Sequence, residues 1–175
     1  MTDATKSTNG AGPANESENQ APIAQIMMNS QYVKDLSFEN PNAPQSLLKK
    51  DKAPSVHVNI EVNVSSIAQD MYETALTISA ESKIEDTPIF VVELVYAGLV
   101  TLKSVPDTHR QAVLFIEVPR LLFPFARAIL ASTTRDGGFP PLMINPIDFA
   151  EMFRHHAAEQ TQKTVEAKAD ANADA

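Results

Sequence analysis

The chain has 175 residues, of which 43% are hydrophobic and 21% charged, and its formal net charge at pH 7 is −8. The absence of cysteine excludes disulfides and thiolate chemistry, the negative charge argues against a nucleic-acid partner, and no apolar run reaches the roughly 20 residues of a membrane span. These features predict one cytoplasmic domain that does not insert into a membrane.

Both ends of the chain are predicted to be flexible tails. Residues 1–21 are rich in Thr, Asn, Gly and Glu, and residues 157–175 alternate alanine with polar and acidic residues. Neither segment has enough apolar surface to offset the entropy lost on ordering. The folded domain is therefore expected to span residues 22–156.

The first half of this domain has the alternation of two that is typical of β-strands. Strands are predicted over residues 24–39, 56–64, 71–80 and 89–101. The second is the most regular, because its five aliphatic residues share one face. In the first strand, the predicted inner face comprises Ile26, Met28, Tyr32, Leu36 and Phe38. Its predicted outer face comprises Gln25, Asn29, Gln31, Asp35 and Glu39.

The connections between these strands predict how the strands pair. A long crossover loop joins the first two strands, and Pro41, Pro44 and Pro54 prevent regular pairing within it. The other links are short, and residues 81–88 are read as a tight hairpin connection. Short links between consecutive strands favour an antiparallel sheet.

The second half of the domain changes to helical spacing. A helix is expected over residues 107–118, capped by Asp107, and Pro119 is expected to interrupt it. A second helix is expected over residues 121–134, with Pro124 in its first turn and an ending at Gly137–Gly138. Its predicted inner stripe comprises Phe125, Ile129 and Ser132.

A last helix is predicted after the proline-rich segment 139–146. Asn145 is its expected cap, and Phe149, Met152 and Phe153 are its expected buried face. Strands followed by helices indicate an α+β fold. We expect a four-stranded antiparallel sheet with helices packed on one face.

The last strand is apolar on both of its faces. If its inner residues are Phe90, Val92, Leu94 and Tyr96, then Ile89, Val91, Val95 and Ala97 point outward around Glu93. An aliphatic strip of this kind favours a contact surface. The alternative is that a loop or the N-terminal tail covers it.

Acidic residues concentrate in the predicted sheet. Residues 56–100 contain seven acidic residues and one basic residue. Asp35 and Glu39 share a strand face and, with Glu93, could form an acidic field suited to a basic protein surface. The alternative is that these acids only keep the sheet face soluble.

The residues that would carry catalysis or hold a metal are not arranged for either. The chain contains no G-x-S-x-G motif and no P-loop, and the adjacent His155 and His156 would point about 100° apart on a helix. Glu85 and Asp86 fall in a predicted turn, where nothing buries them. We therefore expect no enzyme activity, no cofactor and no metal site.

Four sequence blocks resemble the protein-export chaperone SecB family. They are residues 32–44 (YVKDLSFENPNAP), 121–127 (LLFPFAR), 138–142 (GFPPL) and 145–149 (NPIDF). The resemblance covers about residues 22–156. It implies a homotetramer, built as a dimer of dimers. It also implies an ATP-independent holdase that binds unfolded precursor proteins in the cytosol and passes them to the motor SecA.

The resemblance also implies roles for individual residues. SecA binding would involve Asp35, Glu39, Val91 and Glu93. Tetramer assembly would involve Val92, Leu94 and Tyr96. The client groove would include Leu47, Leu48, Phe139, Pro141, Leu142 and Met143. For Leu142 and Met143, local core packing is the alternative.

Two other functions remain open from the sequence. One is a small-ligand carrier or enzyme that uses the space between helix and sheet as a closed apolar pocket. The other is a structural protein that assembles but ignores unfolded chains. Tight uptake of an apolar molecule would favour the first, and assembly without binding of unfolded chains would favour the second.

Overall fold

The computed structural model describes residues 23–48 and 52–158. The N-terminal tail predicted over residues 1–21 lies outside the described residues. So does the predicted C-terminal tail, except for residues 157–158, which continue the last helix.

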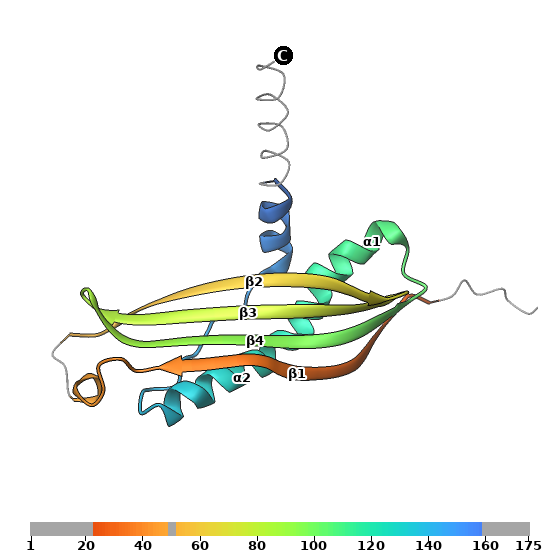
Figure 1. Cartoon of the computed structure of the whole chain (residues 1–175). Helices are drawn as coiled ribbons and strands as arrows, with labels where there is room; N and C mark the ends of the chain where they lie inside the picture. Colours follow the sequence, from red (N-terminus) through yellow and green to blue (C-terminus); the bar gives the residue numbers. More distant parts are fainter. Residues whose placement is uncertain (1–22, 49–51, 159–175) are drawn as a thin grey trace, which may run out of the picture.

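The sheet has four antiparallel strands, as predicted (Figure 1). They are β1 (Gln25–Glu39), β2 (Ser55–Ala68), β3 (Met71–Ile84) and β4 (Thr87–Lys103). Their order is β1-β4-β3-β2, so the crossover loop, with its short helix η1 (Gln45–Leu47), leads from one edge of the sheet to the other. Strands β2, β3 and β4 are longer than predicted, and β1 matches its predicted range to within one residue. The β3–β4 turn leaves only Glu85 and Asp86 unpaired.

The helices pack on one face of the sheet, behind it in the view of Figure 1. They are α1 (Asp107–Ala112), the π-helix η2 (Val113–Glu117) and α2 (Val118–Asp136). A last helix, blue in Figure 1, covers residues 149–158 of the described chain. Within the described ranges, no helix is long and apolar enough to cross a membrane.

The predicted break at Pro119 is wrong. The irregular turn is the π-helix η2 just before it, and α2 continues from Val118 through Pro124. A proline ring inside a helix collides with the carbonyl group four residues earlier, which for Pro119 belongs to Phe115. Phe115 lies within the π turn, whose wider backbone spacing can accommodate the proline ring, and the helix continues.

Two further predictions about the helices need correction. Asp107 begins α1 but makes no capping hydrogen bond, and instead its carboxylate lies 2.9 Å from the Arg110 guanidinium. Phe125 is not part of the inner stripe, because 52% of its side chain is exposed. The buried residues of α2 are Val118, Pro119, Leu122, Phe123, Ala126, Leu130 and Thr134.

The core lies between these helical residues and the inner face of the sheet. The inner-face alternation predicted for β2 and β3 is confirmed, since Ile60 pairs with Ile78 and Val58 with Ala80. Leu76 and Ile78 are fully buried. Burying an aliphatic side chain of this size stabilises the fold by roughly 1.5–3 kcal/mol.

The alternation predicted for the middle of β1 is wrong. Bulges at Asn29 and Lys34 shift its register against β4. Between the bulges, Tyr32 pairs with Ala97 and lies on the outer face. Gln31 lies on the inner face, where its Oε1 accepts a hydrogen bond from the Tyr96 hydroxyl at 3.3 Å. The second bulge restores the predicted faces of Asp35 and Leu36.

Candidate binding surfaces

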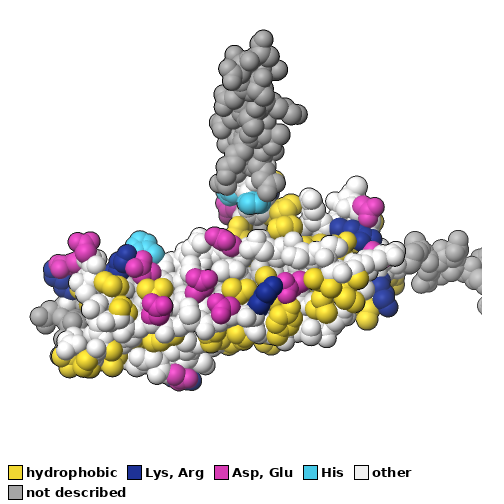
Figure 2. Space-filling model, viewed as in Figure 1, with side chains coloured by type: hydrophobic (Ala, Val, Ile, Leu, Met, Phe, Trp, Pro, Cys, Tyr) yellow, Lys and Arg dark blue, Asp and Glu magenta, His cyan; other side chains and the backbone are white. Residues whose placement is uncertain are grey.

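The outer face of the sheet carries the four residues predicted for SecA binding. Glu39 pairs directly with Val91, and Glu93 lies one pair further along, between Glu39 and Asp35. The carboxylate-bearing residues Asp35, Glu39 and Glu93 are exposed, and Val91 is half-buried. We call these four residues the acidic face. Figure 2 shows acidic side chains spread over this side of the sheet, with hydrophobic side chains between them.

Two residues predicted for the outer strip are buried. Ile89 is only 5% exposed because a register shift between β3 and β4 leaves it unpaired and it joins the core. Ala97 is fully buried on the outer face. Its cross-strand neighbour Tyr32 reaches over β4 to Glu73 of β3, so the tyrosine ring covers it.

A hydrogen-bonded cluster lies beside the acidic face. The Tyr32 hydroxyl donates to Glu73, and the Lys34 ammonium lies 2.7 Å from the same carboxylate. These contacts lower the pKa of Glu73, chiefly through Lys34, and the hydrogen bond to Glu73 raises the pKa of Tyr32. Lys34 thus neutralises Glu73. No ion pair within the described ranges involves the three carboxylates of the acidic face.

The three residues predicted for assembly lie on the inner face of β4. Val92 and Leu94 are fully buried in the core, and Tyr96 stacks on Phe125 with ring centroids 6.4 Å apart. Their side chains therefore have little or no free surface of their own.

An exposed apolar patch adjoins Tyr96, and sequence reasoning missed it. Val33 and Leu36 of β1 and Leu121 and Phe125 of α2 are between 41% and 52% exposed. We call these four residues the β1–α2 patch. The run LLFPFAR contains more apolar side chains than one helical face can bury, and this excess was the available signal.

The residues predicted for the client groove divide into two groups. Phe139 packs against Phe38 and Phe90, with centroid separations of 6.3 and 5.1 Å, and Leu142 is half-buried against the core. The exposed residues are Leu47, Leu48, Pro141 and Met143.

The two loops that carry these residues meet at Gly138. A Cβ atom at Gly138 would lie 3.0 Å from the Leu47 side chain, and its φ of +90° also favours glycine. The crossover loop and the segment after α2 therefore form one continuous, partly apolar surface.

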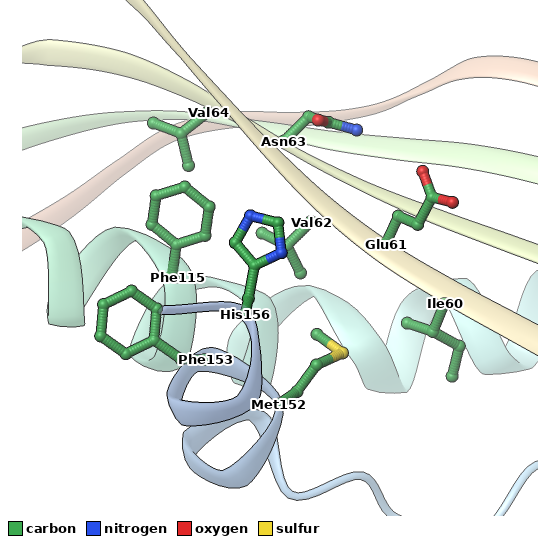
Figure 3. Close-up of a pocket in the computed structure, with 9 residues that line it drawn as sticks. All are labelled: Ile60, Glu61, Val62, Asn63, Val64, Phe115, Met152, Phe153 and His156. Carbon is green, nitrogen blue, oxygen red and sulfur yellow. The ribbon is translucent and has the colours of Figure 1, made fainter. Parts of the chain in front are cut away.

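A groove of about 400 Å³ lies between the edge strand β2 and the last helix. Figure 3 shows Val64 of β2 pointing toward Phe115, with Met152 and His156 contributed by the last helix. Phe115 also stacks on Phe153, with ring centroids 5.7 Å apart. We call this site the β2 groove. It is lined by Ile60, Glu61, Val62, Asn63, Val64, Phe115, Met152, Phe153 and His156.

The β2 groove was not predicted, because Met152 and Phe153 were expected to lie in the buried face of the last helix. Met152 and Phe153 are half-buried rather than buried, because they line the groove, while Phe149 is buried as predicted. The predicted cap Asn145 is wrong, since the helix begins after Asp148. The Asp148 carboxylate accepts hydrogen bonds from the backbone N–H groups of Ala150 and Glu151, each at 3.0 Å. These bonds, chiefly the one from Glu151, lower the pKa of Asp148.

Replacing Asp148 with alanine should loosen the last helix and the wall of the β2 groove. Amide hydrogen exchange at residues 151–156 is expected to accelerate several-fold, because the helix loses its cap. The lowered pKa means that the cap stabilises the fold above the ordinary pKa of aspartate and is lost as the pH falls through the lowered value. Asp136→Ala, at the other end of the helix layer, is the control. Equal exchange in both variants would contradict this role.

The space between α2 and the sheet contains packed side chains. Leu76, Ile78 and Leu94 of the sheet are fully buried there with Leu122 and Leu130 of α2. A carrier that held an apolar ligand between helix and sheet would need this volume. No group of three His, Asp or Glu side chains within residues 23–48 and 52–158 is placed to hold a metal ion.

Comparisons with known proteins identify relatives over most of the chain. A family model described as preprotein translocase subunit SecB matches residues 17–160. The protein-export protein SecB of Parvibaculum lavamentivorans is 51% identical over 86% of this chain and 91% of its own length. That of Nitrobacter hamburgensis is 49% identical over 87% and 94%. That of Maricaulis maris is 42% identical over 99% and 97%.

A solved structure also shares the fold. It is the Mycobacterium tuberculosis Rv1957 SecB-like chaperone in complex with a ChAD peptide from the Rv1956 HigA1 antitoxin. Its TM-score is 0.57 at 14% sequence identity, and the match covers 71% of this chain and 90% of that chain.

Proposed function

The chain belongs to the SecB family of protein-export chaperones, and from this we propose that it is an ATP-independent holdase of the cytoplasm. It binds unfolded precursor proteins, keeps them competent for translocation and delivers them to SecA. The observation that carries this proposal is the separation of two kinds of surface. The β2 groove lies on the helix side of the sheet, and the partly apolar surface of the two loops lies at one end of the domain. The acidic face lies on the opposite side of the sheet.

The loop surface and the β2 groove suit clients of many sequences. Leu48 and Met143 are 65% and 61% exposed, and flexible side chains of this kind adapt to different apolar partners. The β2 groove adds a second apolar surface beside the free edge of β2, whose backbone groups can pair with any extended chain. Folded proteins are rejected because their apolar segments are already buried and their backbone groups already form hydrogen bonds.

Refolding of a slow-folding precursor tests the holdase directly. A several-fold molar excess of the protein should slow refolding without ATP, because bound segments cannot enter the folded state. The double variant Leu48→Asp, Met143→Asp should require several-fold more protein for the same effect. Met27→Asp makes the same change on the outer face and should act like the unaltered chain. An unchanged refolding rate at excess protein would contradict the holdase function.

Delivery to SecA is proposed to use the acidic face. Asp35, Glu39 and Glu93 present uncompensated negative charge around the aliphatic side chain of Val91. Such a surface attracts a basic partner over a distance and then buries a small apolar contact. The grooves remain accessible because they lie elsewhere on the domain.

Assembly as a dimer of dimers is proposed to bury the β1–α2 patch. Its four apolar side chains are exposed in the isolated chain, and a second copy would remove them from water. Substitutions at Val92, Leu94 or Tyr96 would act on assembly through packing, since Tyr96 supports Phe125 of the patch. Several grooves on one particle could then hold one client, and linkage would raise the avidity.

A further inference from the structure

The outer face contains a shallow hollow of about 360 Å³ next to the acidic face. It lies where β3 carries the small side chain of Ser79 between larger neighbours, and we call it the Ser79 hollow. Ser79 pairs with Glu93 on one side and with Asn59 on the other. The hollow is lined by His57, Val58, Asn59, Ser79, Ala80, Glu81 and Val91.

One wall of the hollow already holds a cation. The carboxylate of Glu81 lies 2.8 Å from the Lys83 ammonium, and both side chains are more than a third exposed. Because the pair is solvated, its mutual attraction is weak and a competing cation can exchange with it at low cost. Glu81 also pairs with Val91, so this carboxylate continues the acidic face toward β2.

We propose that the Ser79 hollow receives a lysine or arginine side chain of the basic partner that docks on the acidic face. This inference rests on the proposed docking of SecA. The aliphatic stem of the partner residue lies over Ser79 and against Val91. Its charged end lies between Glu81 and Glu93 and displaces Lys83.

The chemistry of the lining selects this occupant over others. An apolar side chain would remove water from Glu93 and from the Glu81–Lys83 pair without adding a polar partner, which is unfavourable. An acidic side chain would be repelled. A long cationic side chain fits the hollow, because its apolar stem can lie over Ser79 and its charged end can pair with the carboxylates.

Titration of full-length SecA against the full chain, by calorimetry, tests the hollow with three variants. Ser79→Leu fills the hollow without a charge change, and Glu81→Gln removes the carboxylate. Each should lower the affinity on the order of tenfold. Lys83→Ala should raise it several-fold, because Glu81 no longer has an internal partner. Glu85→Gln makes the same charge change in the neighbouring turn, outside the hollow, and should leave the affinity unchanged.

The outcomes separate this inference from the docking proposal itself. If the unaltered chain binds SecA and Glu93→Lys weakens binding, but Ser79→Leu and Glu81→Gln bind normally, the hollow is not a recognition site and only this inference fails. A lower affinity of Lys83→Ala would also overturn the exchange of cations. If the unaltered chain does not bind SecA, the proposed docking fails and the inference fails with it. Native mass and client binding of each variant establish that the fold is intact.

Discussion

Replacing Glu93 with lysine is expected to lower the affinity of the chain for SecA about 100-fold while leaving client binding unchanged. Glu93 is exposed on the outer face of β4, between the cross-strand positions of Asp35 and Glu39. The substitution therefore places a positive charge in the middle of the acidic face, where it repels a basic partner. Its side chain points away from the core, so the fold should tolerate the change.

Surface plasmon resonance with immobilised SecA at two salt concentrations would measure this effect. The loss should be larger at low salt, because ions screen exposed charges. Glu85→Lys makes the same charge change in the β3–β4 turn and is the matched control. If Glu93→Lys bound SecA as tightly as Glu85→Lys, Glu93 would not belong to the docking surface.

Replacing Phe125 with glutamate is expected to convert the proposed tetramer into smaller species. Phe125 is half-exposed in the isolated chain and belongs to the β1–α2 patch, one helical turn after Leu121. A carboxylate at this position would be buried without a partner in the assembled particle, at a cost of several kcal/mol. The isolated subunit should keep its fold, because the new side chain can remain in water.

Native mass spectrometry would resolve the assembly states, and far-UV circular dichroism would report on the fold. Gln111→Glu adds a negative charge at an exposed position of α1, away from the patch, and should remain tetrameric. The conservative variant Phe125→Leu should also assemble. A tetramer that persisted in Phe125→Glu would remove the patch from the assembly interface.

The strands show where the sequence pattern was sufficient and where it failed. In β2 and β3 each apolar residue has a polar neighbour, so only one register buries the apolar set. In β1, two extra residues at Asn29 and Lys34 bulge out of the ladder. Alternation counted along the sequence misplaced Tyr32 and Gln31, because a bulge is visible only against the partner strand.

The prediction of the buried face of α2 failed for a similar reason. Residues 121–130 are apolar on more than one side, so their spacing did not determine which side faces the sheet. The inner stripe depends on where the π-helix η2 sets the phase of α2. That turn lies just before Pro119, and its Leu114 carbonyl accepts a hydrogen bond from Thr74 of β3 at 3.4 Å. This is why the exposed Phe125 was expected to be buried.

Some residues of the candidate surfaces could be predicted from the sequence pattern, and others only from the tertiary structure. The alternation of side chains along the strand predicted that Val91 and Glu93 lie on one face and that Val92 and Leu94 lie on the other. The structure has this arrangement in β4. Phe139 and Leu142 were expected in a groove but are mainly packed against the core. The β2 groove and the Ser79 hollow were not predicted, because each combines residues from elements that are distant in the sequence.

The sequence by itself determined the four strands, the helices that follow them and the concentration of acidic charge in the sheet. These properties are local, since alternation, helical spacing and charge can be counted along the chain. Only the tertiary structure decided the phase of β1, the exposure of the β1–α2 patch and the shape of the grooves. Those depend on which strand lies opposite which residue and on how much side-chain volume the facing elements supply.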